Sequence, residues 1–306
     1  MPLSLLASTF VNNLLPILSL SGAGFVLGKI LALDSRTIGR AVFYIFAPAL
    51  VFNLLLKNDI AVDEALAVAA QAVGMIFLNG ARALALGGSI GRLSPGVFGG
   101  VLATMFGNTG NYGLPLAAFA FGEQGLRYGG LYFVATSILF HTVGVLIASL
   151  GHASFKDAAL GMFKVPTVYG VALALLVNGL DLEIPAALSR TIDLAAGGSI
   201  PLMIVLLGVE LSRAQWSREN LKGAGLSVSL RLLAAPAIAL FLTSLFGMQG
   251  AAWQASMTQA SMPAAVNNMI LASEYKLDSS LVTAIVFFGT LLSPLTLTPL
   301  LVLVGR

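Results

Sequence analysis

Two stretches of this sequence, residues 107–115 and 256–268, place glycine, proline and neutral polar side chains inside long apolar runs. The first reads Gly-Asn-Thr-Gly-Asn-Tyr-Gly-Leu-Pro, a composition that opposes continuous helix. The second reads Ser-Met-Thr-Gln-Ala-Ser-Met-Pro-Ala-Ala-Val-Asn-Asn and is unusually polar for a charge-free run. A helix that breaks and restarts presents unpaired backbone N–H groups and the positive end of its dipole. Two such breaks that face each other therefore predict an anion-binding site.

The side chains in these stretches suit a carboxylate ligand. Proline favours the first turn of a helix, so Pro115 and Pro263 predict where the helical segments restart. Asparagine amides can donate to a carboxylate without carrying charge. Tyr112 could stack on an aromatic substrate or simply form part of a cavity wall. The predicted substrate-binding residues are Asn111, Tyr112, Pro115, Pro263, Asn267 and Asn268.

Four further side chains offer neutral oxygen atoms near the breaks. They are Asn108, Thr109, Gln259 and Ser261, which could ligate Na⁺ or support freed backbone N–H groups. The competing interpretation is that both stretches are proline-kinked helices whose small residues allow close packing. Two breaks in corresponding helices favour a transport site.

The composition identifies the class of protein. The chain has 306 residues, of which 58% are hydrophobic and only 9% are charged, against about 25% charged residues in soluble domains. Its mean hydropathy is +0.93, so we predict an integral membrane protein in contact with a lipid bilayer. The net charge of +3 is scattered, which argues against nucleic-acid binding. With no cysteine and two histidines, we expect no metal site, no cofactor beyond possible Na⁺ or H⁺ coupling, and no enzyme activity.

Apolar runs between the charges predict an all-α protein with ten transmembrane helices. Lysine and arginine number ten on the odd-numbered connections and four on the others, which places both termini outside. The predicted spans are residues 8–30, 37–56, 64–87, 96–122, 127–150, 159–180, 190–211, 221–246, 250–273 and 279–304.

An internal repeat relates residues 1–151 to residues 152–306. Pro48 and Pro201, Arg82 and Arg231, and Pro115 and Pro263 recur at offsets of 153, 149 and 148 residues. Five helices in each half make the second half enter the membrane from the opposite side. The repeats are therefore predicted to be inverted, with helices 4 and 9 broken and crossing.

Charged residues inside the predicted spans are few. Arg82 and Arg231 either bias the cavity toward anions, or Arg82 extends to the interface and Arg231 pairs with carbonyl groups at helix ends. Glu210 is expected at the interface near Arg213, which leaves no acidic side chain in mid-membrane and argues against a carboxylate proton relay. His141 is expected to be a packed polar side chain.

Residues Asn108–Leu116 with Phe121–Leu126, and Ser261–Asn267 with Glu274–Asp278, resemble the fourth-helix and ninth-helix motifs of the auxin efflux carrier family. The resemblance covers the whole chain and implies two inverted five-helix repeats, related to the bile-acid/sodium symporters. It implies a scaffold of helices 1, 2, 6 and 7, through which homodimers form. Helices 3–5 and 8–10 would form a transport domain that moves as an elevator.

By this resemblance, Pro115 and Pro263 match the crossover prolines, and Asn111 and Asn267 lie where substrate carboxylates are held. The short link between halves is similar to that of compact bacterial members. The acidic support residue of the plant members has no counterpart in Ala47–Leu56. We therefore predict a bacterial inner-membrane exporter of small organic anions that works by alternating access. The alternative is a Na⁺-coupled symporter of the bile-acid type.

Overall fold

The fold is described from a computed structural model, in which residues 2–56, 60–90, 94–149 and 160–305 can be described. Within these ranges the chain is all-helical and contains no β-strand, only an isolated bridge between Gly107 and Ala264. The predicted boundary between the two halves, at residues 151 and 152, lies outside the described residues.

The first half contains helices joined in several places by π-helical turns. The α-helices are α1 Leu3–Thr9, α2 Leu15–Ile30, α3 Ser35–Ala41, α4 Ala47–Leu56, α5 Val62–Ile90, α6 Pro95–Met105, α7 Leu114–Leu139 and α8 Val145–Ala148. The π-helical turns are η1 Phe10–Leu14, η2 Val42–Phe46, η3 Thr109–Gly113 and η4 Phe140–Gly144.

The second half has shorter helices toward its end. The α-helices are α10 Pro166–Gly179, α11 Ala186–Ser212, α12 Leu221–Ser229, α13 Ala235–Leu245, α14 Gly250–Ala260, α15 Asn267–Glu274, α16 Ser279–Leu292 and α17 Pro294–Val304. The remaining turns are the 3₁₀ turns η5 Met162–Lys164 and η6 Arg218–Asn220, and the π-helical turn η7 Leu230–Ala234.

Among the described residues, six helical runs are long and apolar enough to cross a membrane, and α16 with α17 adds a seventh if this pair, bent by 51°, is one span. The six runs are Leu3–Ile30, Ser35–Leu56, Val62–Gly87, Thr109–Ala148, Ala186–Ser212 and Arg218–Leu245. All ten predicted ranges contain helix, but some are built from shorter pieces such as α6, α10, α14 and α15. A count of ten crossings stays a prediction.

Gly122 divides the longest run. Its φ of 62° and ψ of −150° interrupt α7, and glycine accepts a positive φ without steric cost. This kink lies between the predicted spans 96–122 and 127–150, so α7 contains the end of one and the beginning of the next.

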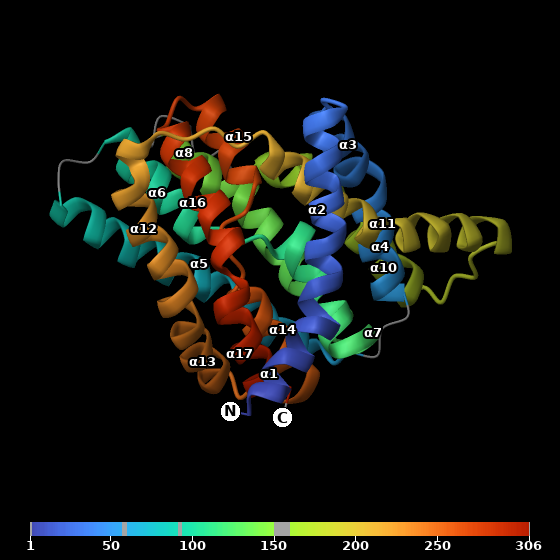
Figure 1. Cartoon of the computed structure of the whole chain (residues 1–306). Helices are drawn as coiled ribbons and strands as arrows, with labels where there is room; N and C mark the ends of the chain where they lie inside the picture. Colours follow the sequence, from blue (N-terminus) through green and yellow to red (C-terminus); the bar gives the residue numbers. More distant parts are fainter. Residues whose placement is uncertain (1, 57–59, 91–93, 150–159, 306) are drawn as a thin grey trace.

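Figure 1 shows α2, α3, α4, α10 and α11 on one side of the molecule and α5, α6, α12, α13 and α16 on the other, with both termini at the same end. On the first side, α2 packs along α11 and α4 packs against α10. Backbones approach closely there, because a Cβ on Gly208 would overlap the Ser21 carbonyl and one on Gly24 would overlap the Val205 carbonyl. On the second side α5 packs against α6, and α12 against α16.

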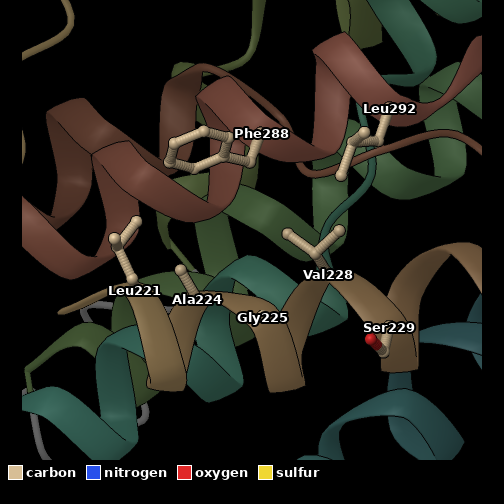
Figure 2. Close-up of a pocket in the computed structure, with 7 residues that line it drawn as sticks. All are labelled: Leu221, Ala224, Gly225, Val228, Ser229, Phe288 and Leu292. Carbon is tan, nitrogen blue, oxygen red and sulfur yellow. The ribbon is translucent and has the colours of Figure 1, made fainter. Parts of the chain in front are cut away.

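An apolar cavity of about 280 Å³ opens between α12 and α16 (Figure 2). It contains none of the predicted site residues, and Ser229 supplies the polar side chain in its wall. Its lining is Leu221, Ala224, Gly225, Val228, Ser229, Phe288 and Leu292. The candidate site is therefore found elsewhere, where the two polar stretches meet.

Candidate functional site: two crossing helix breaks

The two polar stretches meet as short extended segments that run antiparallel. The first break separates α6 from η3, and the second separates α14 from α15. The Asn108 N–H donates to the Pro263 carbonyl at 2.7 Å, and the Ala265 N–H donates to the Phe106 carbonyl at 2.9 Å. These bonds flank the bridge between Gly107 and Ala264. Each break thus supplies hydrogen-bond partners for backbone groups that the other break leaves unpaired.

One predicted restart position is confirmed for the α-helix and the other is wrong. α7 begins at Leu114 with Pro115 in its first turn, although the π-helical turn η3 already resumes the helical run at Thr109. The second helix resumes at Asn267, and Pro263 lies within the break. The π-helical turn accommodates Pro115, because the Leu114 N–H reaches the Thr109 carbonyl. Pro263 lacks an N–H and accepts through its carbonyl, which suits an extended segment.

Arg231 holds the crossing from one side. Its side chain is 3% exposed, its Nε donates to the Met262 carbonyl at 2.7 Å, and its Nη1 donates to the Thr104 carbonyl at 3.2 Å. Gly107 is required beside it, since a Cβ there would overlap Nη2. Of the two interpretations of Arg231, the structure supports pairing with carbonyl groups at helix ends, which otherwise lack partners.

Arg82 lies near Arg231 in the same network. Its Nη2 donates to Asn79 Oδ1 at 2.7 Å and to the Leu230 carbonyl at 2.9 Å. The side chain is half-buried. Arg82 therefore links α5 to η7, next to the residue that holds the crossing.

The three predicted asparagines have different environments. Asn268 is buried, and its Nδ2 donates to the Phe106 carbonyl at 3.0 Å, across the crossing. Asn267 is exposed at the first position of α15. Asn111 is half-buried in η3, and its side-chain amide lies beside the carboxyl group of Glu210 on α11.

The expectation that Glu210 lies at the interface beside Arg213 is wrong. Glu210 is only 6% exposed, and Arg213 turns away to donate to the Ala32 carbonyl at 3.1 Å. Glu210 lies two residues before the end of α11 at Ser212, so the prediction that no acidic side chain lies in mid-membrane stays a prediction. The burial of Glu210 could not be predicted from local spacing, because Glu210 and Arg213 have the i, i+3 spacing of an ordinary surface pair.

Arg213 instead secures the loop between α2 and α3. Its Nη1 lies 3.9 Å from Asp34 Oδ1. Hydrogen bonds from the Thr37 hydroxyl and the Arg36 backbone N–H lower the pKa of Asp34, with a smaller contribution from the charge of Arg213. Asp34 is thus an ionised helix cap at this loop.

The four predicted support residues divide into two kinds. Thr109 Oγ1 lies 2.9 Å from Thr136 Oγ1, and Ser261 Oγ donates to the Met257 carbonyl at 2.7 Å, so both have protein partners. Gln259 Nε2 donates to the Gly129 carbonyl at 3.0 Å, while its Oε1 is buried and finds no hydrogen-bond partner among the described residues. Asn108 is buried, and within the described part of the chain its Nδ2 has no hydrogen-bond partner either.

Two ring residues are packed in the interior. Tyr112 is fully buried, and its hydroxyl accepts a hydrogen bond from Ser293 Oγ at 3.3 Å. In this conformation its ring is covered by protein, and stacking on a substrate stays a prediction. His141 Nδ1 donates to the Ser137 carbonyl at 2.9 Å, and its ring stacks on Phe43. This confirms the packed role predicted for His141.

Comparison with known proteins decides the family. The family described as "Membrane transport protein" matches residues 9–301. This chain belongs to that family. The transporter is 27% identical to an "Uncharacterized transporter" of Methanothermobacter thermautotrophicus, over 89% of this chain and 90% of the relative. It is also 27% identical to a "Putative malonate transporter" of Rhizobium meliloti, over 95% and 94% of the two chains.

A plant relative shares part of the transporter. The "Probable auxin efflux carrier component 5b" of Oryza sativa is 29% identical over 42% of this chain and 36% of its own length. These matches confirm the resemblance to the auxin efflux carrier family. The transporter is accordingly an integral membrane protein of a transport family rather than an enzyme.

Proposed function

We propose that the transporter is a secondary carrier of small organic anions, which bind at the crossing of the two helix breaks. The observation that carries the proposal is the antiparallel pairing of Asn108 with Pro263 and of Phe106 with Ala265. Irregular backbone at membrane depth is tolerated where it is enclosed by protein or lines a cavity. In secondary transporters such backbone forms the substrate site.

The anion would accept hydrogen bonds from the first turns of two helical segments. Some N–H groups of these turns already have acceptors, because Thr109 donates to the Gly107 carbonyl at 2.9 Å, Asn268 to the Ala265 carbonyl at 3.1 Å and Met269 to the Val266 carbonyl at 2.9 Å. The anion would accept from the other N–H groups of the two first turns. Asn111 and Asn267 lie in these turns and would add amide donors, while Pro115, Pro263 and Tyr112 would shape the surrounding wall. The buried guanidinium of Arg231 lies behind the crossing and favours a negatively charged ligand.

A carboxylate is the anion that we propose. A relative of nearly equal length is named a "Putative malonate transporter", and neutral amides with helix N-termini suit carboxylate groups. We further propose export across a bacterial inner membrane, with both termini outside.

The proposed mechanism is alternating access in ten helices that form two inverted repeats. Helices α1–α4, α10 and α11 would be the scaffold, and would also form a homodimer interface. The remaining helices would slide against this scaffold as an elevator. The separation of α2, α3, α4, α10 and α11 from α5, α6, α12, α13 and α16 in Figure 1 supports this division.

Electrical recording from purified transporter in liposomes on a sensor membrane tests the proposal. The challenge would be malonate, malate, citrate, pyruvate and indole-3-acetate, each with and without Na⁺. We expect a saturable current for one class of carboxylate that Asn267→Ala weakens. If neither these currents nor exchange of labelled malonate is observed, the organic-anion proposal is contradicted.

One observation favours Na⁺ coupling as a second candidate. Four buried oxygen atoms in residues 256–268 have no hydrogen-bond partner among the described residues, namely Ser256 Oγ, Thr258 Oγ1, Gln259 Oε1 and Asn268 Oδ1. Neutral oxygens of this kind are ligands for alkali cations. A current that appears only with Na⁺, and that Thr258→Val abolishes, would support the symporter.

A further inference from the structure

A buried carboxyl group lies beside the proposed anion site and has no role in the mechanism above. Glu210 is 6% exposed, and its Oε2 is buried and has no hydrogen-bond partner among the residues that the structure describes. An ionised carboxylate is costly to bury unless other groups compensate for its charge. Glu210 is therefore a group whose proton occupancy can respond to its surroundings.

The compensation comes from Asn111, whose side-chain amide lies beside the Glu210 carboxyl group and can donate to it. Asn111 belongs to η3, the first helical turn after the first break, and η3 packs against α11. An N–H donor to a carboxylate forms a bond about twice as strong as one to a neutral acceptor. Glu210 and an anion bound at the crossing would therefore compete for the same Asn111 amide donor.

Charged neighbours are engaged elsewhere or exposed. Several elements pack against α11, and their exposed titratable side chains are Lys29, Arg36, Arg40 and Tyr44. On α7, Glu123 and Arg127 form an ion pair at 2.7 Å, Tyr128 donates a hydrogen bond to Glu64, and Tyr132 is buried. On η3, the Tyr112 hydroxyl accepts a hydrogen bond from Ser293. On α11 itself, Arg190 is exposed and Asp193 accepts from Asn53. Arg213, at its end, bonds the α2–α3 loop. Among the described residues, the Asn111 amide is the polar side-chain group that lies beside the Glu210 carboxyl group.

We propose that Glu210 is the proton-coupling residue of the transporter, and that its proton and the substrate anion bind together through Asn111. When Glu210 is ionised, it holds the Asn111 amide. A proton from water that binds the carboxylate weakens that bond and releases the amide to donate to a substrate carboxylate. No covalent bond to carbon, nitrogen or substrate changes, and one positive charge enters the site with each anion. This proposal rests on the organic-anion function proposed above.

The position of Glu210 would make the coupling mechanical as well as electrostatic. Glu210 lies on α11, in the proposed scaffold, and Asn111 lies on the broken helix of the proposed transport domain. The ionised state therefore ties the two parts together across their contact. The protonated, anion-loaded state weakens the tie, so the loaded transport domain can move.

Malonate binding to purified full-length transporter, measured by calorimetry between about pH 5 and pH 9, tests this proposal. For the native protein we expect affinity to fall by a factor of about 5 or more as pH rises, the lower range of coupling between two sites. Glu210→Gln, which mimics the neutral acid, should lose this pH dependence and keep the low-pH affinity. Glu274→Gln, which replaces an exposed acid on α15, is the matched control and should respond as the native protein does.

The outcomes separate the two proposals. Protonation of malonate itself acts equally on every variant, so it cannot produce a difference between Glu210→Gln and the control. If Glu210→Gln keeps the native pH dependence, the coupling role is overturned while the anion site stands. If the native protein neither binds nor transports any acid of the panel, the proposed function itself fails.

A second variant covers the case in which Glu210→Gln does not fold. Asn111→Ala removes the amide that links proton to anion, so it should bind malonate more weakly and with little dependence on pH. A steep, native-like pH dependence in Asn111→Ala would overturn the proposal.

Discussion

The two helix breaks carry an asparagine at matching positions but use it differently. Asn111 and Asn268 each lie four residues beyond the bridged residue of their own break, from Gly107 to Asn111 and from Ala264 to Asn268. Asn268 donates across the crossing to the Phe106 carbonyl at 3.0 Å. The Asn111 amide instead lies beside the carboxyl group of Glu210 on α11. The difference indicates that the second break fixes the crossing, whereas the first connects it to another group of helices.

The largest effect is expected from removing the guanidinium that both breaks share. Arg231→Met leaves the Met262 and Thr104 carbonyls without their charged donor in a buried site. We expect the free energy of unfolding to fall by about 3 kcal/mol or more, measured by thermal denaturation in detergent. Arg82→Met, which removes a half-buried donor beside it, should cost less. Equal losses in the two variants would contradict the central role of Arg231.

A smaller loss in the free energy of unfolding is expected from a substitution at the bridge between Gly107 and Ala264. Gly107→Ala would place a methyl group against Arg231 Nη2, and overpacking of this kind costs about 1–3 kcal/mol. The control is Gly197→Ala in α11, where a Cβ meets no atom within 4 Å. It should be neutral or stabilising, since alanine favours helix by up to about 1 kcal/mol. Native stability of Gly107→Ala would mean that Arg231 has room to move.

The smallest effect on stability separates the two asparagines directly. Asn268→Ala leaves the buried Phe106 carbonyl with one donor fewer, and we expect a loss of about 1 kcal/mol in unfolding free energy. Asn111→Ala should change stability less and malonate affinity more. Thermal denaturation and binding measured on both variants decide this, and a reversed pattern would assign the locking role to Asn111.

The sequence predicted the parts of this arrangement that depend on local composition. Glycine, asparagine and proline in residues 107–115 and 256–268 predicted two helix breaks, and the structure brings these stretches together. The two breaks were predicted to lie in corresponding helices of the two halves. That prediction came from counting apolar runs, and hydropathy identifies membrane-spanning runs well. The sequence also predicted, as one of two alternatives, that Arg231 pairs with carbonyl groups at helix ends, because an unpaired arginine inside a membrane is costly.

The residues that the sequence placed wrongly depend on packing between distant segments. Pro263 suits a helix start, yet it lies in the extended break and α15 begins four residues later, at Asn267, because its carbonyl pairs with the Asn108 N–H of the other break. Glu210 has an apparent partner three residues away, while its actual partner, Asn111, is 99 residues away in the chain (210 − 111 = 99). Contacts of this kind follow from how α11 lies against η3.

The crossing has a consequence for how the protein can change in evolution. The two bonds that join the breaks run between main-chain atoms, from Asn108 to Pro263 and from Ala265 to Phe106. Main-chain hydrogen bonds do not depend on which side chain a residue carries, and Gly107 is the point at which added bulk is excluded. The joint can therefore be inherited intact while the side chains around it drift, so that new substrates become accessible without a new fold.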